Sequence, residues 1–180
     1  MRVAIFAYGR TGSTSLCEYI RLSLQLESIV EPFNRDRIHT YTSYDLWKKD
    51  NKVVKFMYPD IKYIDKIQSN FDKIIYLTRE NHIEAAESHV YAELNDCWTG
   101  EYSFADPPVN FVNKMVQRKK EQKTHINSLG GFQVTYEEIF YTKEGVKKVD
   151  DYLGIISDHY KEILDIKHKY RKQIDFKKII

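Results

Sequence analysis

Short apolar runs alternate along this chain with longer segments in which apolar residues recur every three or four positions. Short runs bounded by glycine or polar residues predict buried strands, and the longer period predicts amphipathic helices. The predicted strands are Arg2–Ala7, Val53–Tyr58, Lys73–Thr78 and Phe132–Thr135. The predicted helices are Thr14–Leu26, a segment opened by Pro59, His82–Leu94, a segment opened by Pro108, Lys143–Leu153 and Ser157–Tyr170.

The order of these segments, strand then helix from the N-terminus onward, predicts an α/β fold. Right-handed crossovers build such a sequence into a mainly parallel sheet with helices on both faces, in three layers. Ligands of these sheets bind beyond the carboxyl ends of the strands. The loops after Ala7, Tyr58, Thr78 and Thr135 should therefore converge on one site, and the longest loops are expected at 36–51 and 95–107.

Composition adds few constraints. A chain of 180 residues with 42% hydrophobic content fits one domain, residues 1–180. Its net charge of +2 indicates neither nucleic acid nor an anionic membrane as a partner. Two cysteines, Cys17 and Cys97, are too few for a metal site or a disulfide framework. Without a membrane-length apolar run or a signal-peptide core, we expect a soluble, cytoplasmic protein.

The segment Tyr8-Gly9-Arg10-Thr11-Gly12-Ser13-Thr14 lies between the first predicted strand and helix. Glycines let the backbone approach an anion, and the amides of a helix N-terminus point at it. Serine and threonine also cap helices, and that structural role explains the hydroxyl residues equally well. The loop therefore predicts either a phosphate cradle or a capped helix.

The differences between this loop and other phosphate-binding loops limit which ligands it could bind. A Walker loop has glycine where Ala7 stands and lysine where Ser13 stands. Because that lysine holds the β- and γ-phosphates, its absence disfavours hydrolysis of ATP or GTP. The Gly-x-Gly-x-x-Gly pattern of Rossmann folds is absent as well, which argues against a dinucleotide ligand. The loop suits a single phosphate group, with Arg10 as an additional cation.

Gly9-Arg10-Thr11-Gly12-Ser13-Thr14 resembles the 5′-phosphosulfate-binding loop of sulfotransferases that use 3′-phosphoadenosine 5′-phosphosulfate (PAPS). With its arginine and the following Leu16-Cys17-Glu18-Tyr19, it looks like the bacterial trehalose, or glycolipid, branch. The resemblance implies a P-loop-type fold, PAPS as sulfuryl donor, the 3′,5′-bisphosphate PAP as product, and no metal. It assigns six residues to the 5′ end of the donor: Gly9, Arg10, Thr11, Gly12, Ser13 and Thr14.

Three later segments resemble the same family in the same order. Arg79, after Tyr76-Leu77-Thr78, and Ser88 resemble the site of the 3′-phosphate, where arginine binds two oxygens and serine adds a donor. Tyr136 resembles the tyrosine that meets the adenine. Arg171 and Lys172 resemble a C-terminal basic pair that approaches the 3′-phosphate.

Sulfuryl transfer needs a base for the acceptor hydroxyl and positive charge at the leaving oxygen. Arg10, permanently charged, is the predicted electrostatic group. Glu31, in a Glu-Pro segment like that of carbohydrate sulfotransferases, is the candidate general base, although a solvated glutamate is nearly as good an interpretation. His39 is the second candidate.

Several other polar and aromatic residues have simpler interpretations. His82 and His89 are read as surface residues, and Arg118-Lys119-Lys120 as a solvated helix face. Tyr41, Tyr44 and Trp47 could stack on a sugar or close a small core.

The sequence thus predicts transfer of a sulfuryl group from PAPS to a hydroxyl of an unidentified small molecule or carbohydrate. A carbohydrate or glycolipid acceptor is favoured over a phenol, because of the Glu-Pro segment. One alternative is a module that binds PAP or PAPS with weak or no catalysis. A P-loop nucleotide kinase is another, which the missing Walker lysine disfavours.

Overall fold

The computed structural model describes residues 1–34, 42–94, 108–156 and 163–166. Within these ranges a five-stranded sheet runs in the order β2-β3-β1-β4-β5, and each pairing is parallel. Its strands are β1 (Arg2–Ala7), β2 (Glu27–Val30), β3 (Lys52–Met57), β4 (Lys73–Thr78) and β5 (Phe132–Thr135). The predicted α/β class with a parallel sheet is confirmed.

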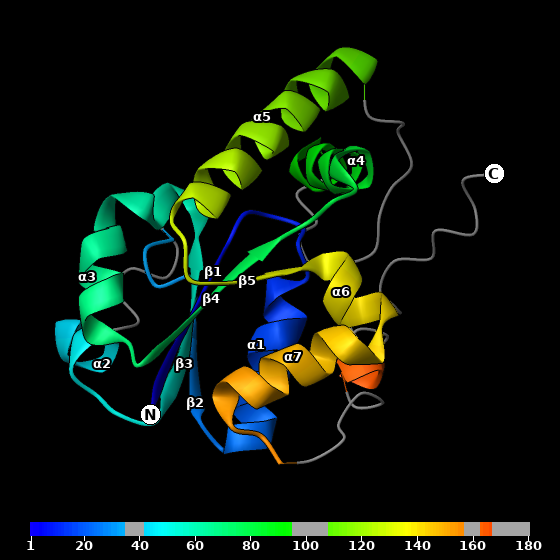
Figure 1. Ribbon diagram of the computed structural model, residues 1–180. Helices are drawn as coiled ribbons and strands as arrows, with labels where there is room; N and C mark the ends of the chain where they lie inside the picture. The colour runs from blue at the N-terminus through cyan, green and yellow to red at the C-terminus, as the bar shows by residue number, and fades with distance from the viewer. Residues whose placement is uncertain (35–41, 95–107, 157–162, 167–180) are drawn as a thin grey trace.

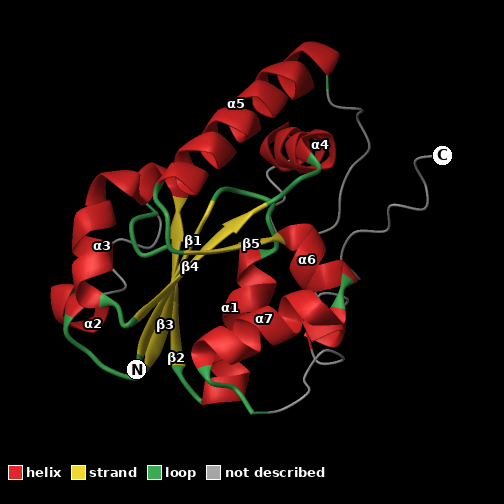
Figure 2. Ribbon diagram, viewed as in Figure 1, coloured by secondary structure: helices red, strands yellow, loops and turns green. Residues whose placement is uncertain are grey.

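Helices cover the sheet from both sides, as Figure 2 shows. They are α1 (Ser13–Leu24), α2 (Ser43–Trp47), α3 (Ile64–Asn70), α4 (His82–Leu94), α5 (Val109–Ser128), α6 (Tyr136–Tyr141) and α7 (Lys143–Leu153). A 3-10 turn, Tyr58–Tyr63, leads into α3 and carries Pro59 in its first turn. None of the helices in the described ranges is long and apolar enough to cross a membrane.

Two hydrophobic cores follow from the alternation of side chains along the strands. Val3 and Ile5 of β1 face a core shared with α1, α6 and α7. Ala4 and Phe6 face the opposite core, which holds residues of α2, α3 and the C-terminal part of α5. Helices α4 and α5 also pack on each other, and in Figure 1 they stand beyond the sheet at the upper end of the view.

The sequence predicts β1, β4, β5, α4 and α7 with their observed bounds. Three short elements were not predicted: β2, α2 and α6. The expected loop at 36–51 was wrong at α2, which is held by a capping box between Thr42 and Asp45. Elements of four to six residues carry too few apolar positions to show a period. The expected loop at 95–107, and most of the predicted helix Ser157–Tyr170, lie outside the described residues.

Candidate anion-binding site

The loop between β1 and α1 is held rigidly at the carboxyl edge of the sheet. The buried Thr11 hydroxyl donates to the carbonyl of Tyr8 at 3.0 Å. The Tyr8 hydroxyl donates to the Arg79 carbonyl and accepts the Arg79 N–H, each at 2.9 Å. Burial raises the pKa of Tyr8, so this hydroxyl keeps its proton. The loop is thereby fastened to the end of β4.

Gly12 is the residue directly before α1. Its φ of 76° is left-handed, and a Cβ there would lie 2.5 Å from the Phe140 ring. Gly12 is the N-cap, and no side chain caps this helix end in the part of the chain that the structure describes. Ser13 and Thr14 lie inside the first turn, so neither caps α1. The arrangement favours a bound anion over the capping interpretation, because the helix dipole and first-turn amides attract negative charge.

Lys55 of β3 reaches the first turn of α1 from the neighbouring strand. Its ammonium donates to Thr14 Oγ1 at 2.8 Å and to Glu31 Oε1 at 2.6 Å. The residue is only 5% exposed. Sequence reasoning missed it, although a lysine inside the apolar run Val53-Val54-Lys55-Phe56 is a signal, because burying a charge without a partner is costly. The structure thus brings Glu31 and Thr14 together through a cation.

Arg10 reaches toward α4. Its Nε donates to Ser88 Oγ at 2.7 Å, which joins two residues that the sequence assigned to opposite ends of the donor. The backbone of Arg10 has a φ of 69°, and its carbonyl accepts from Arg79 Nη1 at 3.0 Å. Ser88 therefore contacts Arg10, and Arg79 reaches the loop through the backbone of Arg10.

Arg79 is 5% exposed and lies with its guanidinium 4.2 Å from the centre of the Tyr136 ring. Nη2 forms an ion pair with Glu84 at 2.7 Å, and Nε lies 3.8 Å from Glu137. Neither of these two nitrogens makes a hydrogen bond within the described structure. The guanidinium retains donor capacity that an oxyanion could use.

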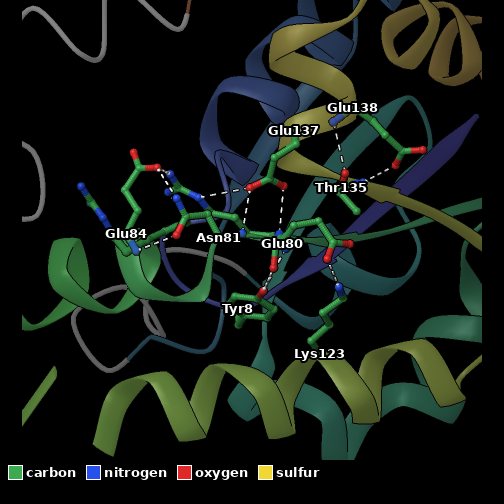
Figure 3. A network of polar contacts seen from close by, with 10 residues as sticks. Tyr8, Glu80, Asn81, Glu84, Lys123, Thr135, Glu137 and Glu138 are labelled. Atoms are coloured by element: carbon green, nitrogen blue, oxygen red, sulfur yellow. Dashed lines mark hydrogen bonds and ion pairs between the residues drawn. The ribbon is translucent and has the colours of Figure 1, made fainter. Parts of the chain in front are cut away.

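Glu137 ties α6 to the turn between β4 and α4. Its carboxylate accepts the N–H groups of Glu80 and Asn81, at 2.9 and 3.0 Å, as Figure 3 shows. In the same view Lys123 of α5 contacts Glu80. Helices from three parts of the chain thus meet at the end of β4.

Two residues read as solvated are instead part of this site. Lys119 is 1% exposed, and its ammonium donates to the Gly9 carbonyl at 3.1 Å and lies 3.2 Å from His89 Nδ1. The interpretation of Lys119 as part of a solvated face was wrong, because it followed the run of basic residues and not the helical period, which places Lys119 on the same face as Met115. His89 is partly buried, not a surface residue.

Tyr44 and Trp47, two of the three aromatic residues expected to stack on a sugar or close a small core, lie in different environments. Trp47 is buried and packs against Phe33 and Phe56, whereas Tyr44 is 66% exposed. Tyr41 lies outside the described residues, as do the site candidates His39, Arg171 and Lys172. Among the described residues, no group of His, Cys, Asp and Glu could hold a metal ion.

Comparison with known proteins gives a fold match. No family model matches the chain, and no curated protein sequence matches it. Among solved structures, mouse sulfotransferase SULT7A1, complexed with PAP, matches with a TM-score of 0.58 at 16% identity. The match covers 98% of this chain and 68% of the mouse chain. The chain therefore has the P-loop-like α/β fold of a sulfotransferase.

Proposed function

We propose that this protein transfers a sulfuryl group from PAPS to an acceptor hydroxyl. The observation that carries the proposal is the loop at the N-terminus of α1, where no side chain from the described residues caps the helix and where three cations gather. Arg10 belongs to the loop itself, Lys55 of β3 contacts Thr14, and Lys119 of α5 contacts the Gly9 carbonyl. Such a concentration of positive charge suits a 5′-phosphosulfate. Further support comes from the fold, which the mouse sulfotransferase complexed with PAP shares.

In this proposal Gly9, Thr11 and Gly12 shape the loop, and the hydroxyls of Ser13 and Thr14 donate to the 5′-phosphate. Arg10 has to leave Ser88 to neutralise the bridging oxygen and the sulfonate. Lys55, held 2.8 Å from Thr14 Oγ1, adds a second cation next to the phosphate position. Both act by electrostatic stabilisation, which supplies most of the rate in such transfers.

Glu31 is the proposed base for the acceptor hydroxyl. Its ion pair with Lys55 holds the carboxylate near the first turn of α1, where the sulfonate of the donor would lie. A base so placed accepts the proton as the new oxygen–sulfur bond forms and the bond from sulfur to the leaving oxygen breaks. His39 is the alternative base.

Arg79, Ser88 and Tyr136 are proposed for the adenosine 3′-phosphate end of the donor. The buried guanidinium, whose Nη2 and Nε have only the ion pairs with Glu84 and Glu137 and no hydrogen bond among the described residues, fits a phosphate there, provided that the partly exposed Glu84 gives way. Arg171 and Lys172 are proposed to complete this subsite. A carbohydrate acceptor is proposed from the Glu-Pro segment at Glu31 and from the arginine version of the loop.

The test is release of PAP from PAPS with panels of carbohydrate and phenolic acceptors. We expect Arg10→Ala to lower kcat/KM by about 100- to 1000-fold, the usual effect of removing one electrostatic donor. Glu31→Gln should lower kcat with little effect on PAP affinity, whereas Lys120→Ala, at an exposed lysine of α5, serves as the control.

Three other results would replace or change the proposed function. PAP binding without turnover on any acceptor would identify a binding module. Thermal stabilisation by ATP with magnesium, and none by PAP, would identify a nucleotide kinase and contradict the proposal. Loss of kcat in His39→Ala and not in Glu31→Gln would reassign the base.

A further inference from the structure

A chain of polar contacts links the outside of α4 to the donor loop through Lys119. The Lys119 ammonium donates to the Gly9 carbonyl at 3.1 Å and stands 3.2 Å from His89 Nδ1 and 5.2 Å from the centre of the Tyr8 ring. His89 Nε2 lies 3.5 Å from Glu93. These contacts join α4 and α5 to a loop 110 positions away from Lys119 in sequence.

The charge of Lys119 determines the tautomer of His89. An ammonium has donors only, so Nδ1 of His89 has to accept and Nε2 has to carry the proton that faces Glu93. Burial, and next the charges of Lys119, Arg10 and Arg118, lower the pKa of His89 to about 3. His89 is therefore neutral at physiological pH, as this geometry requires.

The same contacts account for Gly9. A Cβ at this position would lie 2.9 Å from His89 Nδ1 and 3.6 Å from Lys119 Nζ. The imidazole of His89 occupies the space that a side chain at position 9 would need, and the Lys119 ammonium lies at ordinary contact distance from it. The loop backbone is thereby shaped from the α5 side as well as by Tyr8 and Thr11.

We propose that Lys119 is a positioning residue of the donor loop whose ammonium also contributes positive charge behind Arg10, so that binding of the anionic donor is linked to a proton on Lys119. The ligand in this inference depends on the proposed function, whereas the proposed effect of Lys119 on the loop backbone does not. Of the five groups that face or influence Lys119, Arg10 and Arg118 repel its charge, Glu93 attracts it, and Tyr8 and His89 are neutral.

Burial lowers the pKa of Lys119 to about 8, and the negative charge of Glu93 offsets part of this lowering. A bound dianion would raise this pKa, because it stabilises the ammonium. Donor affinity should then fall as pH rises through 8, where the free protein loses the proton that the complex keeps. A rise of one pKa unit on binding corresponds to about tenfold in affinity.

The experiment measures PAP affinity by calorimetry at pH 7.0 and 9.5 for the wild type, Lys119→Met, Lys119→Arg and the exposed control Lys120→Met. We expect the wild type and Lys120→Met to weaken by about tenfold at the higher pH. Lys119→Met should be weak at both values, and Lys119→Arg should bind at pH 7.0 with no weakening at 9.5. Wild-type affinity and pH dependence in Lys119→Met would overturn the inference.

Hydrogen exchange of the amides of residues 9–14, without ligand, tests the positioning role separately. Faster exchange in Lys119→Met than in Lys120→Met is expected, and equal exchange would overturn that role. If PAP binds no variant, the proposed function fails while this comparison still decides the role of Lys119. If Lys119→Met does not fold, a wild-type PAP affinity that is flat from pH 7.0 to 9.5 overturns the proton linkage.

Discussion

Gly12 is the residue on which the geometry of the loop depends most. Its left-handed backbone would cost an ordinary residue about 1–2 kcal/mol. In addition, a Cβ would lie 2.5 Å from the Phe140 ring and 2.8 Å from the Tyr136 ring. Both rings are packed in the core around α6, so they cannot move aside cheaply.

Gly12→Ala should therefore destabilise the protein by about 2–5 kcal/mol, the sum of backbone strain and overpacking. Gly130→Ala is a matched control, because Gly130 has a φ of 68° and nothing within 4 Å of its Cβ position. It should cost about 1–2 kcal/mol. Urea unfolding of both variants gives the comparison, and equal losses would show that the rings do yield.

The residue scale also shows why buried lysines are hard to recognise in a sequence. Lys55 interrupts an apolar strand and could have been singled out for that reason. Lys119 stands between two other basic residues, and only the packing of α5 on α4 turns it inward. The run of like charges hides which member is buried, but the helical period gives a signal, because Lys119 stands four positions after Met115 and three after Val116.

At the scale of elements, the six-residue helix α6 has a larger role than its length suggests. It follows β5 directly and supplies Tyr136, which stacks on Arg79, and Glu137, which binds two amides of the β4–α4 turn. Its start is fixed by a capping box, in which Thr135 Oγ1 accepts the N–H of Glu138 and the Glu138 carboxylate accepts that of Thr135.

We expect Thr135→Ala to lower the free energy of unfolding by about 0.5–2 kcal/mol through loss of the cap. PAP affinity should fall with it, because Tyr136 and Glu137 lose their fixed positions. Thr135→Ser keeps the hydroxyl and should restore both quantities. Unfolding by urea and calorimetry with PAP measure them, and a stable Thr135→Ala with unchanged affinity would contradict this view of α6.

At the scale of the whole molecule, Lys119 should leave a signature in the pH dependence of stability. Its pKa is about 8 in the folded protein and near 10.5 in the unfolded chain. Between these values the unfolded chain binds more protons, so this group makes stability rise with pH in that window. Below pH 8 the full cost of burying the ammonium is present.

Replacing Lys119 by methionine removes this contribution. The difference in unfolding free energy, Lys119→Met minus wild type, should be largest at pH 7 and smaller by about 2–3 kcal/mol at pH 10. Urea denaturation of both proteins at the two pH values measures it. A difference that does not change with pH would mean that Lys119 keeps an ordinary pKa.

The sequence by itself determined the parallel α/β architecture and the position of the glycine-containing loop between β1 and α1. Apolar runs such as Arg2–Ala7 and Lys73–Thr78 are buried on both sides, so their pattern is local and strong. The short elements β2, α2 and α6 escaped detection, because tertiary contacts and caps hold them. The match to the mouse sulfotransferase at 16% identity is likewise a match of fold.

Only the tertiary structure decided how the charged residues combine. Side chains from β3, α4 and α5 meet the loop because parallel strands end at one edge of the sheet, and the sequence does not specify which of them face each other. It is packing that pairs Arg10 with Ser88, Glu31 with Lys55, and Gly9 with Lys119. Periodicity locates a residue on an element, whereas the electrostatics of a site depend on distances between elements.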